Sequence, residues 1–160
     1  MLSLFSSCNR YIASFCLWFS GLGLILMTFV TGWQVYSRYV LNDSLRWSEQ
    51  FCLMLMLYFI LFAAAAQVRS GSHIGLVIVR ESLPGILKKI VMAITHLIVM
   101  AFGAGMFFFG TQMAASTWSH VIPTLGLPTG LSYLPFPVAG ALFVLFSLEN
   151  TIKLFTTEAQ

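Results

Sequence analysis

Long uncharged runs alternate with short polar segments along this chain of 160 residues. The first run extends from Tyr11 to Ser37 and the second from Gln50 to Val68, and neither contains a charged residue. At about 1.5 Å per residue, these runs correspond to helices of about 40 and 28 Å, long enough or nearly so to cross a hydrocarbon core of ~30 Å. We therefore predict membrane-spanning helices over about 11–37 and 47–68.

The third run, from Ile90 to Leu148, is also free of charged residues and is long enough for two spans. Turn-forming residues interrupt it between Ser116 and Gly130, a segment rich in Ser, Thr, Pro and Gly. The pattern predicts a third helix over about 86–116 and a fourth over about 131–153. Pro137 falls in an early turn of the fourth helix, where we expect it to introduce a kink.

A polar connection of residues 69–89 joins the second and third spans. Within it, Ile74, Val77 and Ile78 recur at helical spacing, which indicates a short amphipathic helix in the membrane interface over about 72–82. Ser82 and Pro84 suit the start of the third helix, as a cap and a first-turn residue.

Composition supports an all-α integral membrane protein with one membrane domain over residues 1–160. Hydrophobic residues make up 59% of the chain and charged residues 8%, against about 25% charged residues in soluble domains. The net charge is +3, but the basic residues are spread among the span ends. Phospholipid headgroups are therefore the expected anionic partners, and nucleic acid is not.

The distribution of Lys and Arg predicts the orientation of the four spans. An even number of spans places both termini and the 69–89 connection on one side of the membrane. That side carries six basic residues, Arg10, Arg69, Arg80, Lys88, Lys89 and Lys153, and the other side carries Arg38 and Arg46. The positive-inside rule then places both termini in the cytoplasm, and segment 38–50 outside.

Residues 38–50, which we call the polar segment, concentrate charge between two apolar runs. Glu49 can pair with Arg46, three residues earlier on a helix, or with Arg38, and Arg38 can instead hold a lipid phosphate. Asn42, Asp43 or Ser44 can cap the second helix. The alternative is that two arginines snorkel to the interface and Trp47 anchors there.

The span interiors contain few groups able to do chemistry. Gln67, His96 and Gln112 are the polar candidates, and Glu149 is read as an interfacial carboxylate rather than a proton site. The cysteines, Cys8, Cys16 and Cys52, show neither a CxxC pair nor a metal-ligand spacing, and the last two are expected to be buried and unreactive. No catalytic set, cofactor or metal site is predicted. Small residues such as Gly103, Gly110 and Gly140 indicate close helix packing.

Three motifs resemble one family. Arg38-Tyr39-Val40-Leu41 with Leu45-Arg46-Trp47-Ser48-Glu49 resembles the signature of the small membrane subunit (the DctQ-like, Q-type small permease) of tripartite ATP-independent periplasmic (TRAP) transporters. Gly71-Ser72-His73-Ile74 before Leu83-Pro84 is similar to a second family patch, and Leu125-Gly126-Leu127-Pro128 with Tyr133 and Pro137 to a third. Gln50 departs from the family, which often has a second acid there.

The resemblance implies a non-catalytic scaffold subunit of a sodium-coupled secondary transporter in the bacterial inner membrane. Its implied partners are a large elevator-type membrane subunit and a periplasmic binding protein that delivers an organic acid such as a dicarboxylate or sialic acid. The implied contact residues for partner or lipid are Arg38, Tyr39, Arg46, Trp47, Glu49 and His73. A self-contained oligomeric channel or exporter, lined by Gln67, His96 and Gln112, remains the alternative, and a membrane enzyme is a more distant one.

Overall fold

The protein is described by a computed structural model over residues 2–43, 45–70 and 85–156. Its helices are α1 (Leu2–Val40), α2 (Arg46–Ser70), α4 (Gly85–Ser116), α5 (Gly130–Tyr133) and α6 (Pro135–Thr156). Within the described residues, four helical segments are long and apolar enough to cross a membrane: Asn9–Val40, Arg46–Ser70, Ile90–Ser116 and Gly130–Ile152. The prediction of an all-helical chain with four long apolar helices is confirmed.

The first helix is longer than the uncharged run that predicted it. It contains 39 residues and continues past Arg38 to Val40, which gives a length of about 58 Å. The predicted interfacial helix at 72–82, together with His73, Ser82 and Pro84, lies outside the described residues.

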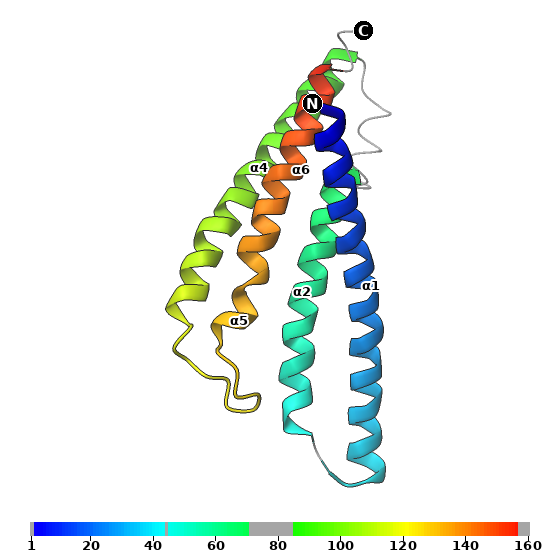
Figure 1. Ribbon diagram of the computed structural model, residues 1–160, viewed down its shortest axis with the longest axis vertical. Coiled ribbons are helices and arrows are strands. Elements are labelled where there is room, and N and C mark those ends of the chain that lie inside the picture. Colours follow the sequence, from blue (N-terminus) through cyan, green and yellow to red (C-terminus); the bar gives the residue numbers. More distant parts are fainter. Residues whose placement is uncertain (1, 44, 71–84, 157–160) are drawn as a thin grey trace.

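The helices form two antiparallel hairpins, α1 with α2 and α4 with α6. Figure 1 shows the hairpins converging at the end of the molecule where both termini lie and diverging toward the opposite end. Contact between the hairpins is made chiefly by α2 and α6. We call the converging end the terminal end and the diverging end the loop end.

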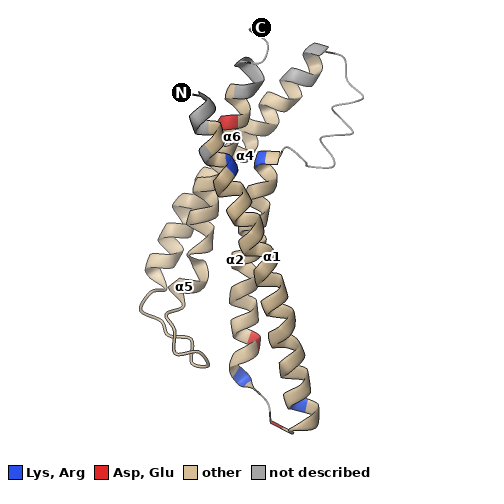
Figure 2. Ribbon diagram, turned by 45° about the vertical axis from the view of Figure 1, so that its right-hand side comes forward, with Lys and Arg blue, Asp and Glu red and all other residues tan. Residues whose placement is uncertain are grey.

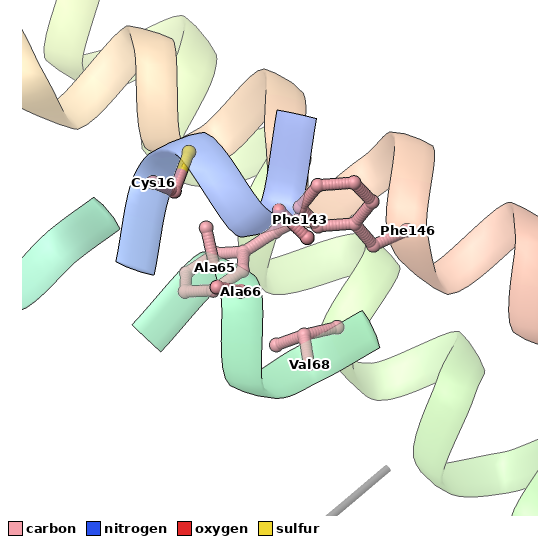
Figure 3. Close-up of a cluster of buried hydrophobic side chains, with 7 residues drawn as sticks. Cys16, Ala65, Ala66, Val68, Phe143 and Phe146 are labelled. Atoms are coloured by element: carbon pink, nitrogen blue, oxygen red, sulfur yellow. The ribbon is translucent and has the colours of Figure 1, made fainter. Parts of the chain in front are cut away.

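The hydrophobic core lies where the hairpins converge. Its buried members come from α1, α2 and α6, and they are Ala13, Cys16, Ala65, Ala66, Val68, Phe143 and Phe146 (Figure 3). The small residues of the Ala63–Ala66 run allow α1 and α6 to approach α2, and Phe146 fills the space between them. Cys16 and Cys52 are buried free thiols, as their positions in apolar runs predict.

Glycines set the distance between α4 and α6. A Cβ atom added at Gly140 would lie 2.6 Å from the backbone oxygen of Gly103, and one added at Gly103 would lie 2.9 Å from the oxygen of Gly140. Gly110 is equally crowded by Phe136 and Pro137. The predicted role of Gly103, Gly110 and Gly140 in close packing is therefore confirmed for this pair of helices.

The region expected to form the start of the fourth span is divided into two helices. α5 ends at Tyr133 and α6 begins at Pro135, so the helix is interrupted before Pro135, where the sequence predicted one helix over about 131–153. Proline lacks the N–H that would continue the hydrogen-bond ladder of α5, which accounts for a break at this point. The preceding loop is closed by a hydrogen bond from Thr129 N to His120 O (2.6 Å). Gly126, at φ +66°, supplies the left-handed residue of its turn.

Candidate functional site

Two polar features lie at opposite ends of the bundle, and the first is the polar segment at the loop end. Its backbone is closed by Ser37, whose hydroxyl donates to the carbonyl oxygen of Asp43 (2.9 Å) and whose own carbonyl accepts from Asp43 N (3.2 Å). Asn42 adopts a left-handed conformation at φ 53°, a common way for a helix such as α1 to end. Asn42 thus follows the end of α1, and Leu45, not Asn42 or Asp43, immediately precedes α2. Ser44, the third predicted cap, lies outside the described residues.

The charged residues of the polar segment all face outward. Arg38, Asp43, Arg46 and Glu49 are exposed, whereas Ser37 and Ser48 are buried against the backbone. Among the described residues the one ion pair is elsewhere, so neither Arg38 nor Arg46 pairs with Glu49. Figure 2 shows the charged residues at the two ends of the bundle, with the helix middles free of them. The polar segment therefore presents unpaired charges to its surroundings.

Aromatic side chains accompany these charges. Tyr39 is 78% exposed and Trp47 is 42% exposed, and Trp47 packs edge-on against Phe51 with ring centroids 5.9 Å apart. Trp47 also borders a hollow of about 370 Å³ between α1 and α2, whose other lining residues are Phe29, Val30, Trp33, Leu45 and Ser48. Of the predicted contact residues, Arg38, Tyr39, Arg46, Trp47 and Glu49 thus lie at one end of the α1–α2 hairpin, and His73 lies outside the described residues.

The second feature is a buried polar cluster at the terminal end, formed by one residue from each of three helices. Glu149 of α6 is 2% exposed, and its carboxylate accepts from Asn9 Nδ2 of α1 (2.8 Å) and from Arg69 Nε of α2 (3.2 Å). The second amino group of Arg69, Nη2, donates to the other carboxylate oxygen (3.3 Å) and to the carbonyl oxygen of Ser6 (3.1 Å). Two-point binding of a carboxylate by a guanidinium fixes orientation as well as charge.

A further bond extends the polar cluster along α6. Asn150 Nδ2 donates to the backbone oxygen of Val68 (2.8 Å), so two consecutive residues of α6 hold the end of α2. The sequence predicted Glu149 near the end of the fourth span as an interfacial carboxylate, and the structure shows that its side chain is buried between helices. Its partner Arg69 lies 80 positions earlier in the sequence. The packing of α2 against α6 brings the two side chains together near the start of α1.

Other polar groups within the helices are bonded to backbone oxygens of neighbouring helices. Ser20 donates to Phe59 O (3.0 Å), Tyr58 to Leu131 O (2.7 Å) and Ser147 to His96 O (2.6 Å). These bonds join α1 to α2, α2 to α5 and α6 to α4. They are suited to fixing helix positions, because each donor is paired with an acceptor that belongs to another helix.

The three polar residues considered as a pathway lining are not brought together. The side chains of Gln67 and Gln112 are exposed, His96 is half-buried, and no hydrogen bond joins any two of them in the described part of the chain. Over the same residues, no group of three His, Cys, Asp or Glu side chains is arranged to hold a metal ion. Gln67, His96 and Gln112 therefore do not form one lined site in the part of the chain that the structure describes.

Comparison with known proteins places this architecture in a family. The family model of the DctQ component of tripartite ATP-independent periplasmic transporters matches residues 27–157, which include the polar segment, Arg69 and Glu149. The chain belongs to this family. It is a TRAP transporter small permease component, and its relatives are transporter subunits rather than enzymes.

Three relatives carry the name of a TRAP transporter small permease protein. The chain is 27% identical to a sialic acid TRAP transporter small permease protein of Vibrio cholerae, over 78% of this chain and 72% of that protein. It is 20% identical to a putative TRAP transporter small permease protein of Haemophilus influenzae, over 93% of this chain and 90% of the relative. It is 28% identical to a C4-dicarboxylate TRAP transporter small permease protein of Rhodobacter capsulatus, over 62% of this chain and 44% of the relative.

Proposed function

We propose that this TRAP small permease component is the non-catalytic scaffold subunit of a sodium-coupled importer of an organic acid. Its partners in this proposal are a large elevator-type membrane subunit, which carries the substrate, and a periplasmic binding protein, which delivers it. The observation that carries the proposal is the family match over residues 27–157. The two relatives with substrate names, for sialic acid and for C4-dicarboxylates, support an organic acid as the transported class.

The packing of the chain supports a scaffold role. An elevator-type carrier needs a stationary element against which the moving part is displaced, and that element must keep its own helices fixed. The buried cluster of Asn9, Arg69 and Glu149 joins three helices, and the glycine contacts hold α4 against α6. Interhelical bonds from Ser20, Tyr58 and Ser147 add further fixed points.

In the proposed orientation both termini lie in the cytoplasm of a bacterial cell and the polar segment faces the periplasm. Among the described basic side chains, Arg10 and Arg69 lie at the terminal end, and Arg38 and Arg46 lie at the loop end. The positive-inside rule supports this arrangement. A reporter enzyme fused after Gln160 is expected to show cytoplasmic activity, and periplasmic activity would reverse the orientation.

The polar segment is proposed as a contact surface for partner subunits or lipid headgroups. Arg38, Arg46 and Glu49 are exposed without an ion-pair partner in the described chain, and Tyr39 and Trp47 supply exposed aromatic area beside them. Aromatic and arginine side chains are enriched among residues that dominate protein interfaces. His73, which the family resemblance adds to this set, is proposed on the same basis.

Co-purification tests the proposed function. The tagged chain is expressed together with the large membrane subunit and the periplasmic binding protein of its transporter, and the membranes are solubilised without crosslinker. The large subunit is expected to be recovered in a fixed ratio with the tagged chain. Recovery of the tagged chain only as a homo-oligomer would contradict the scaffold role and support a self-contained channel or exporter.

A further inference from the structure

Helix α1 has two opposite faces that differ in side-chain size. The face against α2 carries small residues at alternating spacings of three and four, namely Ala13, Cys16, Ser20 and Gly23, all buried. At Gly23 a Cβ atom would overlap the ring of Phe59, so α2 packs directly on the α1 backbone there. Among the large side chains of α1, Phe19 also lies at this contact, with its ring centroid 5.5 Å from that of Phe59 and 5.7 Å from that of Phe62.

The large side chains of α1 form a stripe on the opposite face. It repeats at spacings of three and four over most of the helix, and we call it the outer stripe: Tyr11, Phe15, Trp18, Leu22, Ile25, Phe29, Trp33 and Tyr36. Each of these side chains is between 49% and 73% exposed. A stripe with this repeat is the pattern by which one helix packs along another in a left-handed crossing.

Two hollows lie along the outer stripe. The first has a volume of about 320 Å³ and is lined by Leu17, Trp18, Gly21, Leu22 and Ile25. No atom of the chain lies within 4 Å of the position that a Cβ at Gly21 would take. The second is the hollow of about 370 Å³ between α1 and the start of α2, which Phe29 and Trp33 of the stripe border from one side. The first hollow lies between protruding members of the stripe, which is the relief that an interdigitating helix requires.

The side chain of Trp18 favours a protein helix over lipid acyl chains as the neighbour of the outer stripe. It lies about 10 Å along the axis from the middle of the apolar Asn9–Val40 span. Its side chain is 72% exposed, and its indole N–H makes no hydrogen bond within the described chain. Acyl chains offer no acceptor, and an unsatisfied donor in hydrocarbon is costly. A neighbouring helix can supply a carbonyl or hydroxyl oxygen.

The area of the outer stripe is sufficient for a stable interface. An aromatic side chain buries about 150–250 Å² when fully covered. The eight side chains of the stripe are 49–73% exposed. Together they offer on the order of 800 Å², which is about the area per partner of a stable protein–protein interface. By contrast, the exposed α4 side chains of Leu97, Ile98 and Phe102 have no hydrogen-bond donor, so contact with lipid acyl chains leaves no polar group unsatisfied.

We propose that the outer stripe of α1 is the surface on which the large membrane subunit docks, with a helix of that subunit accepting a hydrogen bond from Trp18 Nε1. This inference rests on the proposed function, which supplies the partner but not the surface. The hollow at Gly21 receives a side chain of the partner helix, and the continuous stripe extends the contact toward Trp33 and the polar segment.

Co-purification of the intact transporter from detergent tests the docking surface through two variants. Gly21→Leu fills the hollow and is expected to reduce the recovered large subunit by about tenfold, because the overlap displaces the partner helix. Trp18→Phe keeps an aromatic side chain but removes the indole N–H donor, and is expected to reduce recovery by about fivefold, as for the loss of one hydrogen bond. The matched control for the added bulk is Ala104→Leu, at an exposed position of α4, and it should leave recovery unchanged.

A photocrosslinking amino acid provides a measurement that does not depend on weakened assembly. Placed at Phe29, it is expected to crosslink to the large subunit, and placed at Phe102 it is expected not to. Crosslinking from Phe102 alone, or from Phe29 to a second copy of this chain, would overturn the proposed surface while leaving the scaffold role intact. Failure of the unsubstituted chain to recover any large subunit would overturn the proposed function, and the docking inference with it.

Discussion

Arg69 of α2 and Glu149 of α6 form a nearly buried ion pair, with Arg69 Nε 3.2 Å from Glu149 Oε2 and the two side chains 17% and 3% exposed. The pair joins the two hairpins at the terminal end, and Asn9 of α1 donates to the same carboxylate oxygen. These three residues come from three helices. Their bonds therefore fix the relative position of the two hairpins and also stabilise the contact between them.

Removal of one member of this pair is expected to destabilise the protein strongly. Glu149→Gln or Arg69→Met leaves the other charge or its hydrogen bonds uncompensated, at a cost of about 3–5 kcal/mol. The double variant, with Met at both positions, should recover much of the loss because neither charge then remains. Thermal unfolding in lipid nanodiscs measures this, with exposed Glu49→Gln as the control. Single and double variants of equal stability would contradict the assigned role.

The close approach of α4 and α6 predicts opposite results for two glycine substitutions. Gly140→Ala places a Cβ 2.6 Å from both Gly103 O and Phe107 N and is expected to cost about 1–3 kcal/mol through overpacking. Gly105→Ala lies on the same pair of helices but meets no atom within 4 Å. It should be neutral or stabilising by up to about 1 kcal/mol, because alanine favours the helix. Unfolding midpoints of the two variants in one detergent provide the comparison.

Tyr58 links α2 to α5 through one hydroxyl group. Tyr58→Phe removes the bond to Leu131 O, which is 2.7 Å long, and should lower stability by about 0.6–1 kcal/mol. Tyr36→Phe removes a hydroxyl from an exposed side chain without such a bond and is the control. A Tyr58 variant indistinguishable from the Tyr36 variant in thermal unfolding would show that this bond contributes nothing to the position of α5.

The polar segment should affect assembly without affecting stability. Glu49→Lys reverses an exposed charge that has no ion-pair partner in the described chain, so the unfolding midpoint is expected to stay the same. Recovery of partner subunits or substrate uptake is expected to fall severalfold if this surface contacts a partner, since like-charge contacts oppose binding. Thr124→Lys, in the exposed loop between α4 and α5, is the control. Unchanged recovery and uptake would reduce the polar segment to a membrane anchor.

The long apolar runs were sufficient to predict the four membrane helices, because a span needs a continuous stretch of nonpolar residues that is visible locally. The buried state of Glu149 was not predictable in the same way, since its environment depends on Asn9 and Arg69, both distant in sequence. Glu149 stands alone between apolar residues and Asn150, and that isolation near a span end is the signal that suggests a tertiary partner. The interruption before Pro135 is not predicted by the sequence, because Pro135 and Pro137 are both compatible with the early turns of one helix.

The direction in which the outer stripe of α1 faces is also not predictable from the sequence alone. Its spacing is present in the sequence, but two interleaved apolar patterns run along this helix, and only the structure shows which one faces α2. The small residues Ser20 and Gly23 face inward, and the large ones, such as Trp18 and Phe29, face outward. In a soluble protein the larger side chains would be expected inside. In a membrane, burial of small residues allows close helix contact.

Sodium-driven uptake into proteoliposomes tests the scaffold account most directly. Vesicles are prepared with this chain alone, with the large membrane subunit alone and with both, and each is supplied with the substrate-loaded binding protein. The account predicts uptake at full rate only when both chains are present, and none with this chain alone. Sodium-dependent uptake by this chain in the absence of the large subunit would contradict it.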